Sequence, residues 1–205
     1  MNKVVVLASG GLDSSVLLAL YKNLGYEVYP LYIHYDNKNV CEEIEKLKEV
    51  CSSLDIPKDN MWTIDAHFYY SRSSCVADGN NPYVEMRNLV FMSYAVSYAE
   101  NIGAQTIAVG FIKVPVGYPD TSKQFLSDFN VMSYSAIGIE AKAPLMELDK
   151  IGVYKLGRKL GIGLKNTISC NTPKDGKPCG ECDDCKDIKN IIQEVGVEDE
   201  DNPFL

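Results

Sequence analysis

The sequence Val4-Val5-Val6-Leu7-Ala8-Ser9-Gly10-Gly11-Leu12-Asp13-Ser14 runs from an apolar, β-branched segment into a polar turn with two glycines. The apolar segment is typical of a strand that is buried on both faces, as in a parallel sheet. Asp13 or Ser14 can cap a following helix, whose apolar stripe comprises Val16, Leu17, Leu20 and Leu24. The stretch therefore predicts a strand, a tight turn and a helix in succession.

The turn is a candidate phosphate-binding loop. Two glycines let backbone N–H groups converge on an anion, next to the positive end of a helix. Serine hydroxyls add donors, and Asp13 offers a hard oxygen ligand for Mg²⁺. The loop lacks both the Walker pattern and GxGxxG, and a plain glycine turn with a helix cap is the alternative. The residues expected at the phosphates are Leu7, Ala8, Ser9, Gly10, Gly11, Leu12, Asp13, Ser14 and Ser15.

The alternation of strand and helix continues along the chain. Further strands are expected at residues 28–33, 61–64 and 106–109, and further helices at 41–54, 88–101, 123–134 and 150–160. This order predicts an α/β fold, a doubly wound parallel sheet with right-handed crossovers and a ligand at the carboxyl ends of the strands. The polar residues 67–81 are expected to form a long loop.

Composition narrows the class of protein. The chain has 205 residues, of which 46% are hydrophobic and 23% charged, as in ordinary globular domains. Its net charge of −8 argues against a broad surface for nucleic acid. No apolar run reaches the roughly 18 residues that a membrane span needs. Seven cysteines, mostly near one end, suit a reducing compartment, so we expect a cytoplasmic protein without nucleic-acid or membrane partners.

Four of the cysteines form a candidate metal site near the C-terminus. Their spacing is C-x8-C-x2-C-x2-C, through Cys170, Cys179, Cys182 and Cys185. Four thiolates favour a closed, structural zinc site, and a 4Fe–4S cluster is the alternative. The residues after Cys170 have little apolar content and are not expected to make a core of their own. We expect an α/β domain at residues 1–165 and, packed on it, a zinc-binding appendage with an acidic tail at 166–205.

The turn and three further segments resemble a known family. Ser-Gly-Gly-Leu-Asp-Ser is similar to the loop of the PP-loop ATP pyrophosphatases, whose fold is HUP-like, or adenine nucleotide alpha hydrolase-like. Tyr83–Asn88, Gly117–Asp120 and Thr167–Cys170, together with the cysteine cluster, resemble the QueC family of 7-cyano-7-deazaguanine synthases over nearly the whole chain. The resemblance is to a carbon–nitrogen ligase that uses ATP and Mg²⁺ and holds zinc.

The resemblance implies a reaction. The family adenylates 7-carboxy-7-deazaguanine, releases AMP when ammonia forms the amide, and uses a second ATP to convert the amide to the nitrile. It implies catalytic roles for Ser9, Asp13, Ser14, Arg87 and Lys150, and substrate contacts for Tyr83, Arg87, Asn88, Tyr118 and Asp120. Each role has a plainer alternative, namely a surface arginine, a simple turn or a solvated lysine. A homodimer is also expected from the resemblance.

The chain departs from the family pattern in places. Residues 35–39 read Tyr-Asp-Asn-Lys-Asn instead of Tyr-Gly-Gln-Arg-His, and residues 121–125 read Thr-Ser-Lys-Gln-Phe instead of Cys-Arg-Pro-Glu-Phe. Glu85, Ile168 and Asn171 replace a proline, a tryptophan and a tyrosine. The chain is thus a divergent member. The alternative function is an amide ligase that passes the deazaguanine acid to another amine, such as a protein N-terminus. A non-catalytic binding module is a third hypothesis.

Overall fold

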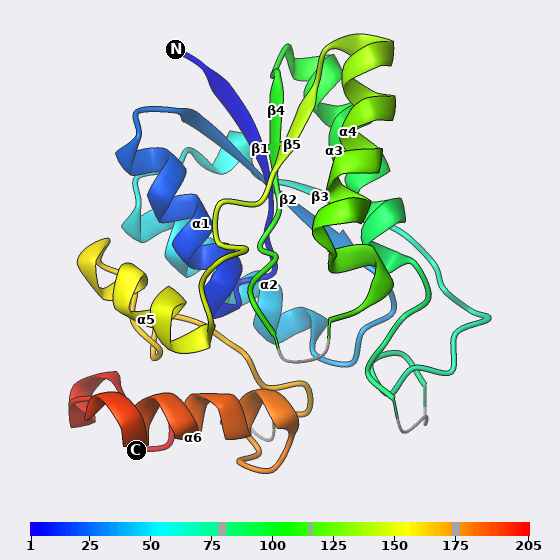
Figure 1. The fold of residues 1–205 in the computed structure, drawn as a ribbon. Coiled ribbons are helices and arrows are strands. Elements are labelled where there is room, and N and C mark those ends of the chain that lie inside the picture. The colour runs from blue at the N-terminus through cyan, green and yellow to red at the C-terminus, as the bar shows by residue number, and fades with distance from the viewer. Residues whose placement is uncertain (78–80, 115–116, 174–176) are drawn as a thin grey trace.

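The computed structural model describes residues 1–77, 81–114, 117–173 and 177–205 (Figure 1). Within these residues five parallel strands form one sheet in the order β3-β2-β1-β4-β5. The strands are β1 (Lys3–Leu7), β2 (Glu27–His34), β3 (Trp62–Asp65), β4 (Thr106–Ala108) and β5 (Glu140–Lys142). From β1 the chain builds the sheet outward through β2 and β3 and then returns to the other side of β1 to form β4 and β5, so the carboxyl end of β1 is a topological switch point. The predicted doubly wound fold is confirmed.

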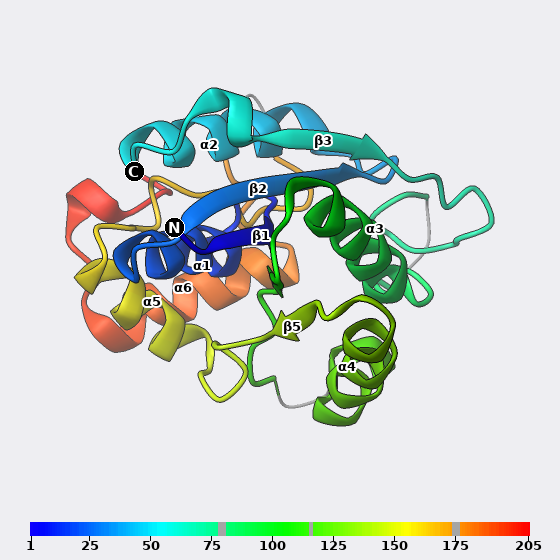
Figure 2. The same cartoon turned by 90° about the horizontal axis from the view of Figure 1, so that it is seen from above.

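Helices cover both faces of this sheet (Figure 2). One face carries α1 (Leu12–Asn23), α2 (Val40–Ser53), α5 (Lys150–Lys159) and α6 (Asp183–Val195), and the other carries α3 (Arg87–Ile102) and α4 (Lys123–Ile137). The alternation along β1 divides the two cores, because Val4 and Val6 pack on the first face and Val5 on the second. All three valines are fully buried, so β1 holds the two layers together.

One local expectation was wrong, and one strand was missed. The N-cap of α1 is Gly11, without a side-chain hydrogen bond, and Asp13 lies inside the first turn. Strand β5 was not expected, because its sequence Glu-Ala-Lys has a single apolar side chain, the buried Ala141. Of the predicted loop, residues 67–77 and 81 contain neither helix nor strand, and residues 78–80 lie outside the described part of the chain.

The C-terminal segment is less separate than its composition suggested. Helix α6 buries Ile188 and Ile191 in the same apolar cluster that α1 and α5 form. These two residues, with Ile192 and Val195, have the spacing of one helix face, and this periodicity is a signal in the sequence that composition alone conceals. The tail therefore contributes to the main core. The domain boundary at residue 165 stays a prediction.

The acidic end of the chain is anchored by one aspartate. Asp201 is 6% exposed, and its carboxylate accepts hydrogen bonds from the Tyr154 hydroxyl at 3.0 Å and from the Lys165 backbone N–H at 3.2 Å. A side chain at Gly163 would collide with this carboxylate. Burial and the bond to Asp201 raise the pKa of Tyr154 to about 12. The last turn of the chain is thereby fixed on α5.

No helix in the described ranges is long and apolar enough to span a membrane. The expected cellular location stays a prediction.

The contribution of α6 to the core can be measured. Ile191→Ala should lower the free energy of unfolding by about 2–5 kcal/mol, because it leaves a cavity at a fully buried site. The matched control is Ile137→Ala on α4, where the side chain is 41% exposed and a loss below about 1 kcal/mol is expected. Urea unfolding measures both. Equal, small losses would show that α6 does not belong to the cooperative core.

Candidate functional site

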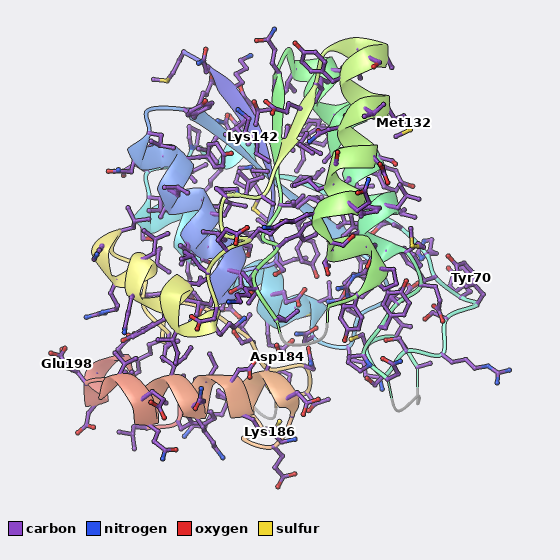
Figure 3. The ribbon with its side chains drawn as sticks, viewed as in Figure 1. Tyr70, Met132, Lys142, Asp184, Lys186 and Glu198 are labelled. Atoms are coloured by element: carbon purple, nitrogen blue, oxygen red, sulfur yellow. The ribbon has the colours of Figure 1, made fainter. Side chains whose placement is uncertain are left out.

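A pocket of about 750 Å³ opens at the carboxyl ends of β1, β2 and β4. Its volume lies in the range of small-molecule and cofactor sites. Its wall includes most of the loop after β1, the starts of α2, α3 and α5, and the start of α6. In Figure 3, Asp184 lies on the side of α6 that faces the sheet, whereas Lys186 points away from it. The pocket therefore lies at the carboxyl ends of the strands, where the sequence predicted a ligand.

The loop after β1 is shaped by its own polar atoms. The Ser14 hydroxyl donates to the Gly11 carbonyl at 3.1 Å and accepts the Ser9 N–H at 3.2 Å. The first i→i−4 bond of α1 runs from Ser15 to Gly11, so the N–H groups of residues 12–14 have no partner within the helix. Residues 7–9 and 11–14 line the pocket. Free N–H groups at a helix N-terminus are suited to bind an anion.

Asp13 and Lys150 form an ion pair across the pocket wall. The Asp13 Oδ2 to Lys150 Nζ distance is 2.9 Å, and both side chains are about four-fifths buried. Burial lowers the pKa of Lys150, but the charge of Asp13 and the hydrogen bond to it raise the pKa by more, so the lysine stays protonated. Asp13 Oδ1 is buried and has no hydrogen-bond partner in the described residues. A buried, unpaired carboxylate oxygen is a position that a hard cation can fill.

Arg87 presents a second, separate cation. It begins α3, and its NH1 group donates to the Tyr35 hydroxyl at 3.0 Å. Its guanidinium lies over the rings of Tyr35 and Phe91, at 4.9 and 5.7 Å from their centres. Within the described ranges it has no ion-pair partner. The aromatic rings orient a charged fork without neutralising it, so Arg87 can receive a carboxylate or a phosphate.

The other predicted substrate residues fall into two groups. Asn88 and Tyr118 line the pocket. Tyr83 and Asp120 lie behind the wall: Tyr83 stacks on the Tyr118 ring with centres 5.0 Å apart, and Asp120 is buried and accepts the Asn88 N–H at 2.9 Å. These contacts fix the start of α3. Their roles toward a substrate stay predictions.

Two loop residues also lie away from the pocket. The Ser15 side chain is fully buried behind the loop, and Gly10 faces α2. Gly10 has φ +76°, and an added Cβ would lie 2.7 Å from the Glu43 carbonyl oxygen and 2.9 Å from the Leu47 nitrogen. Both approaches are too close for any side chain. Gly10 therefore sets how α2 packs against the loop.

Glu43 is a pocket residue that the sequence reasoning missed. Its Oε2 accepts the Tyr32 hydroxyl at 2.8 Å and the Asn37 side-chain amide at 2.9 Å. Burial raises the pKa of Glu43 to about 7, although these hydrogen bonds and the charge of Arg87 act in the opposite direction. Its signal in the sequence was an acidic residue in the first turn of the helix after the second strand, which by itself is ordinary.

Three acidic residues at the start of α6 were missed as well. Asp183, Asp184 and Asp187 line the pocket, but their helix was not expected. Burial raises the pKa of Asp184, against the charge of Lys150 and a 2.6 Å hydrogen bond from Asn171. The pocket thus has an acidic wall opposite the loop.

The four predicted cysteines come together as a candidate metal site. All four sulfur atoms lie within 4.8 Å of one another, and the Cys179 and Cys185 sulfurs are 3.9 Å apart. Cys179 accepts N–H bonds from Glu181 and Cys182, and Cys170 accepts one from Cys179. A hydrogen bond from Thr172 and these N–H groups hold the pKa of Cys179 below its usual range. Thiolates oriented in this way are able to bind a metal ion.

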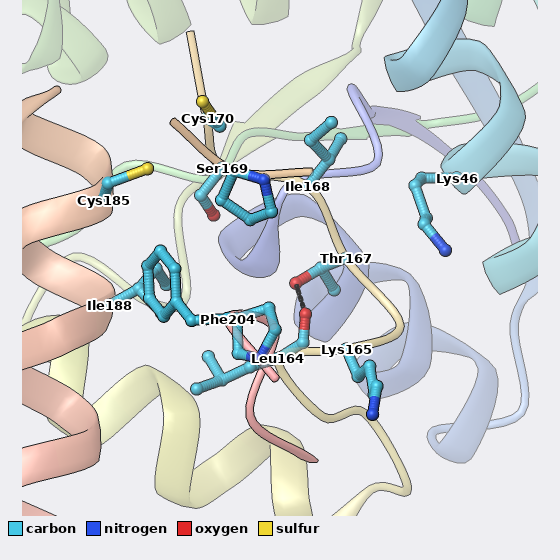
Figure 4. A pocket seen from close by; sticks show the side chains of 12 residues that line it. Lys46, Leu164, Lys165, Thr167, Ile168, Ser169, Cys170, Cys185, Ile188 and Phe204 are labelled. Atoms are coloured by element: carbon cyan, nitrogen blue, oxygen red, sulfur yellow. Dashed lines mark hydrogen bonds between the residues drawn. The ribbon is translucent and has the colours of Figure 1, made fainter. Parts of the chain in front are cut away.

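The chain segment that leads into the cysteines separates the large pocket from a smaller hollow of about 210 Å³ (Figure 4). Ile168 and Ser169 line both spaces. The Thr167 hydroxyl donates to the Leu164 carbonyl at 3.0 Å and stiffens the turn between them. The Ile168 N–H donates to the Gly10 carbonyl at 3.0 Å. The cysteine segment is therefore bonded directly to the loop.

The close approach at Gly10 gives a test of this geometry. Gly10→Ala should cost about 1–3 kcal/mol more than Gly25→Ala, because only Gly10 would press its new methyl group against backbone. Gly25 is the matched control, with φ +78° and open space around it, and we expect about 1–2 kcal/mol for the backbone strain alone. Urea unfolding compares them. Similar losses would mean that α2 does not press on the loop.

The fold has known counterparts among solved structures. A 4-thiouridine synthetase in complex with RNA and ATP superposes with a TM-score of 0.55 at 16% identity, over 78% of this chain and 41% of that one. NMN synthetase from Francisella tularensis gives a TM-score of 0.50 at 19% identity, over 96% and 73% of the two chains. At these identities the likeness concerns the fold, which is that of PP-loop proteins.

Sequence comparison is more specific. Residues 3–196 match the family described as queuosine biosynthesis protein QueC. The 7-cyano-7-deazaguanine synthase of Oceanobacillus iheyensis is 34% identical over 97% of this chain and 96% of its own length. The protein of the same name from Nautilia profundicola is 32% identical over 97% of both. The chain therefore belongs to the QueC family, as its motifs suggested.

Proposed function

We propose that the protein is an ATP-dependent carbon–nitrogen ligase that converts 7-carboxy-7-deazaguanine and ammonia, through the amide, into 7-cyano-7-deazaguanine. One observation carries the proposal: a single pocket contains an anion-binding loop, the Asp13–Lys150 pair and the separate cation Arg87. A ligase of this kind has two anions to align, a triphosphate and a carboxylate. The family membership agrees with this reading.

Binding of ATP is assigned to the loop and Lys150. The free N–H groups at the start of α1 would donate hydrogen bonds to the phosphates that leave as pyrophosphate, and Lys150 Nζ places a positive charge beside them. Asp13 Oδ1, buried and unpaired, fits the oxygen ligand of a magnesium ion. Mg²⁺ would neutralise phosphate charge there. The protein's part is alignment and charge stabilisation, as in phosphoryl transfer generally.

Binding of the acid is assigned to Arg87 and the aromatic wall. The Tyr35 and Phe91 rings hold the guanidinium facing the pocket, where it can orient the substrate carboxylate toward the α-phosphate. Tyr118, stacked on Tyr83, offers a flat surface on which a deazaguanine ring can lie. Attack by the carboxylate oxygen on the α-phosphate gives the acyl-adenylate and pyrophosphate. The amine then displaces AMP, and a second adenylation of the amide oxygen permits elimination to the nitrile.

The cysteine site is proposed to hold zinc. A tetrahedral Zn²⁺ with Zn–S bonds of about 2.3 Å places its sulfurs about 3.8 Å apart, close to the 3.9 Å between Cys179 and Cys185. Zinc would act structurally, since four thiolates leave no open position. The residues after Cys170 would be stabilised by it.

The metal assignment has a direct check. Elemental analysis of the purified protein should give one zinc per chain, and Cys182→Ser should lose that zinc and unfold at a lower temperature. Cys41→Ser is the matched control, because Cys41 is exposed on α2 and outside the cluster. If the site instead holds an iron–sulfur cluster, the analysis should find iron in place of zinc, and the protein should absorb visible light.

The function is tested by mass spectrometry of the product. The protein with ATP, Mg²⁺, ammonium and 7-carboxy-7-deazaguanine should form the nitrile, with two AMP for each molecule. Amide alone, or a deazaguanine-sized adduct on a protein amine, would instead support the alternative amide ligase. No AMP under these conditions would contradict both. The expected homodimer is checked separately by light scattering.

A substitution of Lys150 tests the proposed phosphate-binding site. Lys150→Met should lower the rate of AMP formation by about 10²-fold or more, because a preorganised charge beside the phosphates is lost. Lys155→Met lies on the same helix with its side chain exposed, and should keep the wild-type rate. Equal rates in the two variants would remove Lys150 from the proposed site. Initial rates of AMP release at saturating acid provide the comparison.

A further inference from the structure

Glu43 has a fixed position in the pocket. It lies in the first turn of α2, and its carbonyl oxygen sits where a side chain on Gly10 would have to go. The anion-binding loop and Glu43 are therefore in backbone contact. Because the positive φ of Gly10 maintains this contact, the Glu43 backbone cannot shift relative to the loop without moving α2. A pocket group held in this way is preorganised for the reaction that the loop supports.

The Glu43 carboxyl is held by neutral donors. Its hydrogen bonds come from Tyr32 and Asn37, and both of these side chains are buried. Asn37 also donates to Asn39, whose amide donates to the Cys170 carbonyl at 3.0 Å. The network thus ties Glu43 to the metal-binding segment. No cation lies within ion-pair distance of Glu43 in the described ranges.

The other acids of the pocket are engaged differently. Asp13 pairs with Lys150, and Asp183 pairs with Lys186 at 2.7 Å. Asp184 accepts from Asn171 and feels the charge of Lys150, while Asp187 is exposed to solvent. Glu43 is thus a partly buried pocket carboxyl that, within the described residues, has hydrogen bonds from neutral donors and no cation at ion-pair distance. Such a group exchanges a proton more readily than a carboxylate that is neutralised by a cation.

The charged and titratable groups that face Glu43 are few. Tyr32 faces it from β2, Tyr35 from the turn just after β2, and Arg87 from the start of α3. Burial raises the pKa of both tyrosines, so they stay neutral near pH 7. Burial favours the neutral form of Glu43, while the hydrogen bonds from Tyr32 and Asn37 and the charge of Arg87 favour the carboxylate. The net effect leaves the pKa of Glu43 near neutrality, where general bases work best.

We propose that Glu43 is the catalytic base for the amine nucleophile: its carboxylate takes one proton from ammonium and so frees the nitrogen lone pair for attack on the activated acid. The inference rests on the proposed function and names a residue for the second half of the reaction, in which the amine attacks the adenylated acid. The nitrogen lone pair forms the C–N bond to the acyl carbon. The C–O bond to AMP breaks and AMP keeps the electron pair. Ammonium, the form present at neutral pH, gives its first proton to the Glu43 carboxylate, which passes it to water. The nitrogen releases a second proton to water as the amide forms.

A role in binding the guanidine-like edge of the deazaguanine ring is the alternative for Glu43. That role requires a permanently ionised carboxylate, which a cationic neighbour or solvent exposure would favour. Within the described residues no cation lies at ion-pair distance from Glu43, burial raises its pKa to about 7, and its Oε2 already accepts two hydrogen bonds. The observations therefore favour proton transfer.

The experiment separates the two halves of the reaction. Acid-dependent exchange of labelled pyrophosphate into ATP reports adenylation without an amine, and amide formation from ammonium reports the second half. Glu43→Gln should lower amide formation relative to exchange by about 10²–10⁴-fold. Hydroxylamine, which is already neutral at pH 7, should restore most of the rate in this variant. Glu45→Gln, exposed on the same helix, should match the wild type in both assays.

The outcomes distinguish the inference from the proposed function. Glu43→Asp retains a carboxyl and should keep part of the ammonium-dependent rate, which a merely structural role would not predict. Equal loss with ammonium and hydroxylamine, or no loss at all, would overturn the assignment of Glu43. Absence of exchange in the wild type would overturn the proposed function, and the inference with it.

Discussion

The site depends on the close contact between Gly10 and the first turn of α2. The left-handed backbone of Gly10 leaves no room for a side chain, because the Glu43 carbonyl lies there. On its other side the loop is held by the Ile168 N–H, which donates to the Gly10 carbonyl. A residue with a Cβ would separate the loop from α2. One glycine therefore sets the spacing of three chain segments that are distant in sequence.

This packing gives the charges of the pocket distinct tasks. Asp13 and Lys150 neutralise each other in part and leave one carboxylate oxygen unpaired beside the loop. Arg87 is oriented by aromatic rings, which do not cancel its charge. Glu43 is held by neutral donors, so its charge stays available for proton exchange. Each group has the environment that its proposed step requires, namely phosphate transfer, carboxylate alignment and proton removal.

Sequence reasoning reached the features that depend on local pattern. The β-branched run before Gly10 predicted β1, and cysteine spacing predicted the metal cluster. It missed what depends on tertiary neighbours. Glu43 resembles any acidic residue in a first helical turn until Tyr32 and Asn37 surround it. Helix α6 was not predicted because polar and cysteine residues around Ile191 masked its helical periodicity. Its acidic pocket residues were therefore missed as well.

The divergent residues 35–39 acquire a physical meaning from the network. Tyr35 orients Arg87, Asn37 bonds Glu43, and Asn39 reaches the Cys170 carbonyl. By contrast, residues 121–125, which also depart from the family pattern, do not line the pocket. Tyr35, which orients the carboxylate-binding Arg87, matches the family pattern, whereas the changes at residues 36–39 alter the surroundings of the proposed base. If this chain accepts a different amine from its relatives, the difference should therefore originate between β2 and α2, while the adenylation half stays the same.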